Sequence, residues 1–197
     1  YVAPGKYGIT VTPPRLDDAG GPVTWIQTTT IEGTKVIDAW VKANEPPFFA
    51  EFGPAGWHVF IGFTKEFNAI PPPPGTAAAN ITGLVVNNHL SRPPNYAFNA
   101  GTCFGHTTPW VGLNEMVGGL PGPGLWAAPT FGDCQFEIPN VPAGDYQLVV
   151  WDSALDLVFA FAGVSIGGAN PTCDPTGTGT CELGPVPVFQ WFHRSEH

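Results

Sequence analysis

The sequence predicts an all-β fold built as two β-sandwich units that a proline-rich linker joins. Its 197 residues include 25 glycines and 23 prolines, and 13% of them are aromatic, a composition typical of many short strands joined by turns. Several segments alternate apolar and polar residues, which is the period of a half-buried strand. No segment shows the 3.6-residue periodicity with capping residues that marks a helix, although residues 152–162 offer one helical turn.

Two stretches far apart in the chain resemble each other. Residues 2–11, VAPGKYGITV, and residues 141–150, VPAGDYQLVV, share a glycine, a charged residue, a tyrosine and then alternating aliphatic residues. Internal similarity of this kind indicates repeated structural units. We therefore interpret the first stretch as a late strand of a domain whose beginning lies outside this chain.

The first unit is expected over residues 1–70, as the C-terminal part of a sandwich repeat with an insertion. Alternation over residues 7–11 predicts a strand, which two prolines end because proline cannot donate to a strand ladder. Residues 57–63, WHVFIGF, are expected to form the last strand of this unit. The insertion is expected over residues 15–56.

Within this insertion, residues 25–31 and 35–41 are rich in β-branched side chains. Glu32 and Gly33 separate the two runs. Short, glycine-containing connections between such runs predict a β-hairpin.

Residues 71–75 form the predicted linker, because consecutive prolines favour a stiff polyproline II conformation. Residues 76–168 are expected to form a complete sandwich, and residues 169–197 a disulfide loop and the start of a further strand or unit. Strands are expected in the complete sandwich over residues 80–88, 110–116, 134–141, 145–152 and 157–168. Residues 117–133, rich in glycine and proline, are expected to be a loop.

Side chains at strand period predict the core of this second unit. Residues that face the core are expected to be Phe136, Ile138, Tyr146, Leu148 and Val150. The apolar run over residues 157–168 predicts a strand buried on both faces. Gly144 is expected where the backbone needs a positive φ or has no room for a Cβ atom. Tyr146 is expected to reach the backbone with its hydroxyl, as in a tyrosine corner.

Three motifs give the second unit a resemblance to a known class of domain. The pattern I-x-G-x-V is matched by Ile81, Gly83 and Val85. The pattern V-x-L is matched by Val111 and Leu113. The pattern F-x-(I/V)-x-x-(L/V)-P-x-G-x-Y-x-(L/V)-x-V is matched by Phe136, Ile138, Val141, Pro142, Gly144, Tyr146, Leu148 and Val150.

With these motifs, residues 78–168 resemble the repeats of the Cna-B, SdrD-B and carboxypeptidase-regulatory-like domains. The resemblance implies that both units are immunoglobulin-like (prealbumin-like) β-sandwiches. It also implies a section of a large bacterial surface protein with tandem repeats. Gly5 and Tyr7 then correspond to Gly144 and Tyr146 as fold-motif residues.

The charge balance bears on partners. Seven Lys and Arg residues stand against sixteen Asp and Glu residues, for a net charge of −9. This balance argues against nucleic acid, which proteins bind mainly through Lys and Arg. No apolar run is long enough for a membrane-spanning helix, so membrane insertion is not expected. The expected partners are neighbouring repeats or copies of the same protein, with polysaccharide as an alternative.

The four cysteines are Cys103, Cys134, Cys173 and Cys181. Four cysteines allow three pairings. Cys173 and Cys181 flank a flexible Gly/Thr loop that a disulfide would close, so we expect them to pair and leave Cys103 with Cys134. Disulfides are typical of oxidising compartments, which predicts an extracellular or cell-surface location.

No cofactor is expected, although two metal sites deserve a test. Copper or zinc is an alternative at His89 and His106, and at His193 and His197, which form an HxxxH pair near the C-terminal end. The resemblance to SdrD-type repeats implies calcium as a second alternative. No EF-hand loop is present, which leaves Asp17 with Asp18, and Asp152 with Asp156, as its candidate ligands.

No catalytic motif appears, so the chain is not expected to be an enzyme. Trp126 and Trp110 are candidates for stacking on sugar rings, although packing inside the protein is the more frequent role of such residues. We expect a structural or adhesive segment of an extracellular multi-repeat surface or filament protein, with strand addition between repeats. The alternatives are a carbohydrate-binding module of a secreted enzyme and a metal-binding surface protein.

Overall fold

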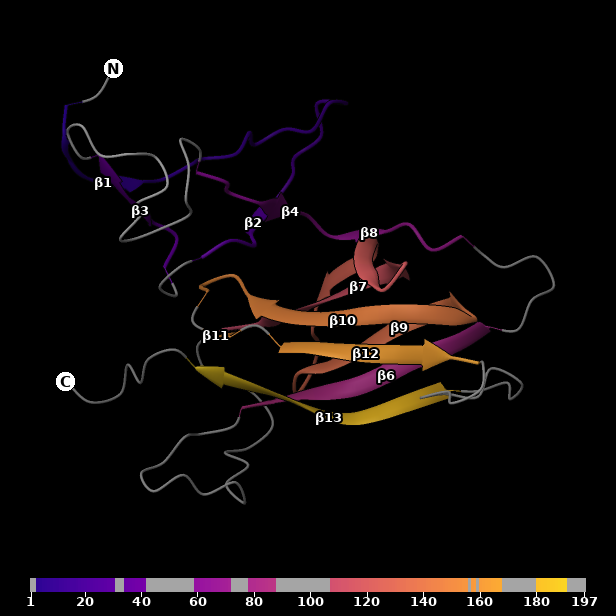
Figure 1. Cartoon of the computed structure of the whole chain (residues 1–197). Helices are drawn as coiled ribbons and strands as arrows, with labels where there is room; N and C mark the ends of the chain where they lie inside the picture. Colours follow the sequence, from indigo (N-terminus) through magenta and orange to yellow (C-terminus); the bar gives the residue numbers. More distant parts are fainter. Residues whose placement is uncertain are drawn as a thin grey trace, which may run out of the picture.

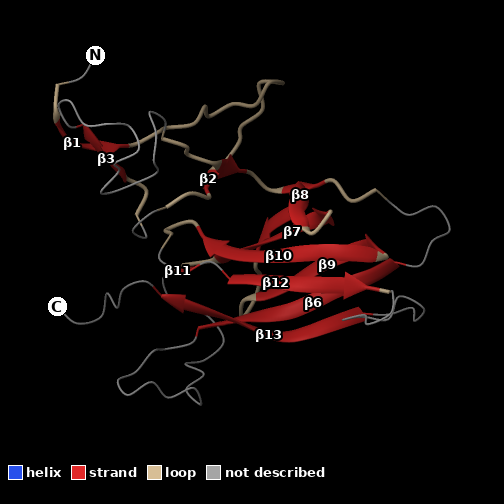
Figure 2. Ribbon diagram, viewed as in Figure 1, coloured by secondary structure: helices blue, strands red, loops and turns tan. Residues whose placement is uncertain are grey.

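The computed structural model describes residues 3–30, 34–41, 59–71, 78–87, 107–155, 157–158, 160–167 and 180–190. All regular secondary structure in these ranges is β-strand, which confirms the all-β prediction (Figure 2). The single helical turn considered for residues 152–162 is not formed by those that the structure describes. Two strands, β11 and β12, occupy part of that segment instead.

Two larger sheets pack face to face as a β-sandwich (Figure 1). The five-stranded sheet has the order β12-β10-β7-β8-β5. Its strands are β5 (Phe67–Asn68), β7 (Pro109–Val117), β8 (Leu120–Pro129), β10 (Gly144–Asp152) and β12 (Ala160–Ile166). The four-stranded sheet has the order β11-β13-β6-β9. Its strands are β6 (Ala78–Asn87), β9 (Gln135–Pro142), β11 (Leu157–Val158) and β13 (Thr180–Gln190).

The core lies between these two sheets and combines alternate side chains of both. The five residues that strand period assigned to the core are all buried, which confirms that prediction. The other sheet-borne core residues include Ile81, Val85, Val111, Leu113, Val164, Ile166, Val186 and Val188. Burial of aliphatic side chains from both sheets supplies the main stabilising free energy of such a sandwich.

One prediction about the core is wrong. The run over residues 157–168 was expected to be buried on both faces, but Phe161 is 63% exposed. The reason is that β12 is an edge strand of the five-stranded sheet, and its outer face is not covered by the residues that the structure describes. Its inner face, with Val164 and Ile166, is buried as expected.

Gly83 in β6 shows why a glycine stands at this core position. A Cβ atom there would lie 2.5 Å from the Cζ atom of Phe136 and 3.2 Å from the carbonyl oxygen of Gly184. The first distance is shorter than a Cβ atom tolerates and the second is a tight contact, so a larger residue would force the ring of Phe136 to move. Gly83 is therefore a site of close approach between side chain and backbone.

The segment over residues 117–133 is not the loop that its composition predicted, because residues 120–129 form β8. Gly118 and Gly119 have φ values of 62° and 81° and join β7 to β8 in a two-residue hairpin. Two successive positive φ values are the requirement of a type I′ turn, and glycine meets it without strain. The prolines of β8 are tolerated because only Trp126 and Ala127 pair with β5 on its other side.

Strand β13 runs parallel to β6 and lies between β6 and β11 in the four-stranded sheet. The sequence placed these residues in a disulfide loop and the start of a further unit. In the structure β13 belongs to the same sandwich as β6, β7, β9, β10 and β12, and Val186 and Val188 lie in its core. Parallel pairing joins segments far apart in the chain, so no local sequence signal indicates it.

The N-terminal part forms two further sheets of two strands each. In one, β1 (Gly5–Ile9) pairs with β3 (Ile37–Val41), and in the other, β2 (Ile26–Gln27) pairs with β4 (Phe63–Thr64). The predicted hairpin between residues 25–31 and 35–41 is therefore wrong, because each run pairs with a strand elsewhere. Of the expected last strand over residues 57–63, the structure describes residues 59–63, and among these only Phe63 lies in β4. That residues 1–70 are the C-terminal part of a second sandwich repeat stays a prediction.

A smaller apolar cluster joins the N-terminal part to the sandwich. Trp110, Ala127 and Trp151 lie on the outer face of the five-stranded sheet, and Ile26 of β2 and Phe67 of β5 pack against them. Strand β5 itself extends the five-stranded sheet before the predicted linker begins. Of this linker, only Pro71 is among the described residues.

Candidate interaction site

The chain forms a tyrosine corner where it passes from β9 in one sheet to β10 in the other. The hydroxyl of Tyr146 donates a hydrogen bond of 2.9 Å to the carbonyl oxygen of Pro142. A Cβ atom on Gly144 would lie 3.1 Å from the Tyr146 hydroxyl oxygen. Gly144 is thus needed because the ring lies over its backbone, and it does not adopt a positive φ. This confirms the predicted roles of both residues.

The corner closes one end of the sandwich core, since Tyr146 is buried. Burial raises the pKa of Tyr146 above its usual value of 10.0, and the nearby carboxylates of Glu115 and Asp145 raise it further. Burial disfavours the charged phenolate because an apolar surrounding solvates it poorly. The two carboxylates disfavour it by repulsion between like charges.

A second tyrosine corner occurs at β1. The hydroxyl of Tyr7 donates a hydrogen bond of 2.7 Å to the carbonyl oxygen of Ala3, again four residues earlier in the chain. Gly5 lies under this ring, and a Cβ atom there would be 3.6 Å from the ring carbon Cε2 of Tyr7. The similarity is therefore one of structure as well as of sequence, over residues 3–9 and 142–148.

The two corners also share the register of the strand that pairs beside them. In the antiparallel pair of β1 and β3, which are distant in the chain, the partners are Gly5–Val41, Tyr7–Ala39 and Ile9–Ile37. In the hairpin of β10 and β12 they are Gly144–Ile166, Tyr146–Val164 and Leu148–Ala162. The glycine and the tyrosine of each corner thus face equivalent positions of an antiparallel neighbour. The pair β1–β3 has the same arrangement as the last hairpin of the sandwich.

No family model, curated protein or solved structure matches this chain. The resemblance to Cna-B and SdrD-B repeats therefore stays an expectation from the motifs. Within the described part of the chain there is no apolar helix of the length needed to cross a membrane.

The two corners differ in what surrounds them. Strand β10 pairs with β7 on its other side, whereas β1 pairs only with β3 among the described residues. Tyr146 is 6% exposed and Tyr7 is 37% exposed. Val150 is fully buried, and its counterpart Val11 is 46% exposed. The second corner thus lacks, within the described residues, the neighbouring strand and the opposing sheet that complete the first.

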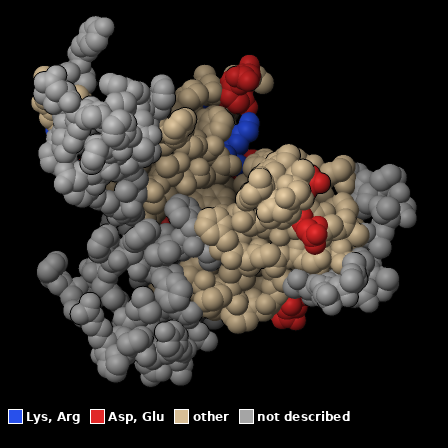
Figure 3. Space-filling model, viewed as in Figure 1, with Lys and Arg blue, Asp and Glu red and all other residues tan. Residues whose placement is uncertain are grey.

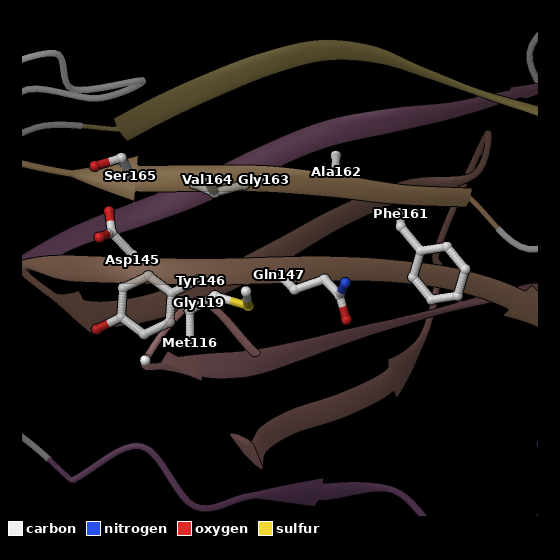
Figure 4. Close-up of a pocket in the computed structure, with 11 residues that line it drawn as sticks. Met116, Gly119, Asp145, Tyr146, Gln147, Phe161, Ala162, Gly163, Val164 and Ser165 are labelled. Atoms are coloured by element: carbon white, nitrogen blue, oxygen red, sulfur yellow. The ribbon is translucent and has the colours of Figure 1, made fainter. Parts of the chain in front are cut away.

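A shallow pocket lies over the hairpin of β10 and β12, on the outer face of the five-stranded sheet (Figure 4). Its volume is about 750 Å³, and its lining includes Asp145, Gln147, Phe161 and Ser165. Gly163 pairs with Gln147 and leaves space between these side chains, because a Cβ atom there would meet nothing within 4 Å.

The structure confirms disulfide bonding at two of the predicted cysteines and narrows the pairing. Cys134 and Cys181 are disulfide-bonded. Cys134 adjoins β9 and Cys181 lies in β13, and these strands flank β6 on opposite sides. Two strand spacings of ~4.8 Å separate them, more than the ~7 Å between Cα atoms that a disulfide spans. Cys134 and Cys181 are therefore not bonded to each other, and the predicted pairs Cys103–Cys134 and Cys173–Cys181, whose other members lie outside the described residues, stay predictions.

The metal candidates are mostly outside the described residues. His89, His106, His193 and His197 all lie there, as does Asp156. In the part of the chain that is described, no three His, Cys, Asp or Glu side chains gather in a way that could hold a metal ion. Acidic side chains are scattered over the face in Figure 3.

The described calcium candidates already have protein partners. The carboxylate of Asp17 accepts hydrogen bonds from the amides of Ala19 and Gly21, at 3.0 Å and 2.7 Å. Asp152 is buried and accepts a 2.7 Å hydrogen bond from the hydroxyl of Thr107. Both carboxylates thus stabilise local structure, a turn in one case and the end of β10 in the other.

The two tryptophans proposed for sugar stacking have different surroundings. Trp110 is 8% exposed, and its ring centroid lies 6.1 Å from that of Trp151. A ring buried in this way offers no face to a sugar, so this assignment is wrong. Trp126 is half-buried in β8 and packs against the core, not in an exposed loop as expected. Phe161 is an exposed aromatic residue that was not predicted from the sequence, because the apolar run around it is typical of a core strand.

Proposed function

We propose that this chain is a non-enzymatic structural or adhesive segment of an extracellular surface or filament protein, assembled from β-sandwich repeats. The observation that carries the proposal is the repetition of the tyrosine corner together with an antiparallel neighbouring strand. The sandwich contains this arrangement once, as β10 and β12, and the N-terminal part contains it again, as β1 and β3. Tandem sandwich repeats produce such copies at regular places in a chain.

Two further features support the extracellular location. Cys134 and Cys181 are disulfide-bonded, and disulfides persist mainly outside the reducing cytosol. Acidic residues outnumber basic ones sixteen to seven, which keeps a protein soluble and limits its attraction to anionic membranes.

Surface labelling of intact source cells tests the proposal. Antibodies raised against the disulfide-bonded chain are expected to bind cells that have not been permeabilised. External protease is expected to remove the signal, while a cytosolic marker stays intact. Detection of the antigen only after lysis would contradict the proposal.

Carbohydrate binding is the second candidate function, and the pocket over β10 and β12 favours it. Phe161, Gln147 and Asp145 project from two adjacent strands, and an exposed ring beside polar side chains suits a sugar. Polysaccharide binding should then be lost in Phe161→Ala. Phe131→Ala is the matched control, because Phe131 is similarly exposed but does not line the pocket. Equal binding by both variants would exclude this site.

A further inference from the structure

We infer that the edge of β1 away from β3, which has no other strand among the described residues, takes up an antiparallel strand of the β7 type from a neighbouring repeat. The inference rests on the proposed function and specifies how its repeats join. The sandwich supplies the template, since β10 lies between β12 and β7. We take β3 as the equivalent of β12, because β3 follows β1 in the chain and pairs with it antiparallel, as β12 does with β10. The equivalent of β7 is then the position at the other edge of β1.

Backbone groups make this edge a docking surface. A strand presents N–H and C=O groups on both sides, and a strand with one neighbour leaves half of them for another partner. Among the described residues, β3 is the one strand that pairs with β1. An added strand would extend the β1–β3 pair by the same ladder that joins β7 to β10, a mode of recognition known as β-strand addition.

The side chains of β1 define the chemistry of the partner. Tyr7 and Ile9 lie on one face of the strand, and Val11 continues it two residues beyond β1, because side chains alternate. All three retain exposure, whereas Tyr146, Leu148 and Val150 at the equivalent positions are buried. This face of β1 therefore has exposed apolar area, which the neighbouring repeat would cover when one of its strands pairs with β1.

The register of β7 on β10 shows which residues the partner needs. Tyr146 lies opposite Glu115, Leu148 opposite Leu113 and Val150 opposite Val111. Transferred to β1, this register places a polar residue beside Tyr7, an aliphatic residue beside Ile9 and another beside Val11. The partner strand thus has the pattern V-x-L-x-E, read towards its C-terminal end. Within this chain, β7 is already paired with β8 and β10, so a neighbouring repeat supplies the strand.

A peptide with the sequence of residues 107–118, TTPWVGLNEMVG, is the probe for this edge. Added to the complete, disulfide-bonded chain at up to about 1 mM, it should slow amide hydrogen exchange over residues 5–11 by about tenfold or more. The same peptide with proline in place of Leu113 is the control, because it cannot form the ladder. Exchange in β13, far from this edge, should not change.

Two chain variants of similar exposure sharpen the test. Val11→Asp places a charge on the docking face and should abolish the slowing. Val117→Asp changes another exposed valine, at the β7–β8 turn, and should leave the slowing intact. No slowing with the peptide, or the same slowing with the proline control or in Val11→Asp, would overturn the inference.

The peptide experiment and the surface labelling of cells can fail independently of each other. Failure of the peptide to protect β1, with the antigen found on the cell surface, would reject this joint but leave a surface protein of another assembly. Protection of β1, with the antigen found only inside cells, would reject the extracellular role and keep the joint.

Discussion

Tyr146 and Tyr7 form the same corner in two different surroundings. Each hydroxyl donates to the carbonyl oxygen four residues earlier, and each ring lies over a glycine two residues earlier. Tyr146 lies in the core of a sandwich, while Tyr7 lies on a two-stranded sheet. The hydrogen bond therefore depends on local sequence alone, and burial depends on the strands that come from elsewhere.

The tyrosine corner therefore forms both with and without the burial that normally stabilises it. A two-stranded sheet is marginal by itself, because it has no second layer on which to bury its apolar face. The hairpin of β10 and β12 is covered by the four-stranded sheet. In the pair of β1 and β3, Ile37 is buried, but Tyr7 remains 37% exposed, and no second sheet covers the pair among the described residues. Substitutions at equivalent positions of β10 and β1 should therefore have unequal effects on the isolated chain.

The largest difference is expected between Leu148→Ala and Ile9→Ala. Leu148 is fully buried, so its truncation leaves a cavity and should lower the free energy of unfolding by about 2–5 kcal/mol. Ile9 is only half-buried, and Ile9→Ala should cost less than about 1 kcal/mol. Denaturant unfolding of the isolated chain measures both, and equal costs would show that β1 lies in a core of its own.

A smaller difference is expected between Gly144→Ala and Gly5→Ala. The added Cβ atom would lie 3.1 Å from the hydroxyl oxygen of Tyr146, but 3.6 Å from the nearest ring atom of Tyr7. The first contact forces a buried ring to move, at a cost of about 1–3 kcal/mol. The second is an ordinary van der Waals contact, so Gly5→Ala should be almost neutral. Thermal unfolding of the two variants compares them, and a Gly144→Ala variant as stable as the natural chain would contradict this account of the corner.

The smallest effect is expected from alkaline pH. Because the pKa of Tyr146 is raised in the folded chain, its neutral phenol stabilises the fold at pH values below about 10, the pKa of an unfolded tyrosine. This contribution is lost as the pH rises through the raised pKa, since unfolding then releases a proton. The free energy of unfolding should fall less steeply above pH 10 in Tyr146→Phe than in the natural chain. Identical slopes would show that Tyr146 does not carry the effect.

The sequence predicted what local patterns determine. Strand period placed Phe136 and Ile138 in the core, and the spacing of Gly144 and Tyr146 predicted the corner, because each depends on residues close together in the chain. The hairpin at Gly118 and Gly119 was missed, although a Gly-Gly pair between apolar residues is itself a signal for a two-residue turn. The prolines that follow Gly119 favoured the prediction of a loop over residues 117–133.

Long-range pairing was the part that the sequence could not predict. The pairing of β13 with β6 joins distant segments, and so does the pairing of β1 with β3. Strand pairing at long range depends on which edges and faces remain after the local hairpins form. The candidate interaction site follows from such pairing. The sequence therefore indicated the motif of Gly5 and Tyr7 but not the strand beside it.

Residue-level amide hydrogen exchange of the isolated chain tests the central claim most directly. Strand β10 has neighbours on both sides over residues 146–150, so each amide there should be protected. Strand β1 has one neighbour among the described residues, so protection should alternate along it, with every second amide exchanging rapidly. Uniform protection of β1 at the level of β10 would contradict the account, because its second edge would already be occupied.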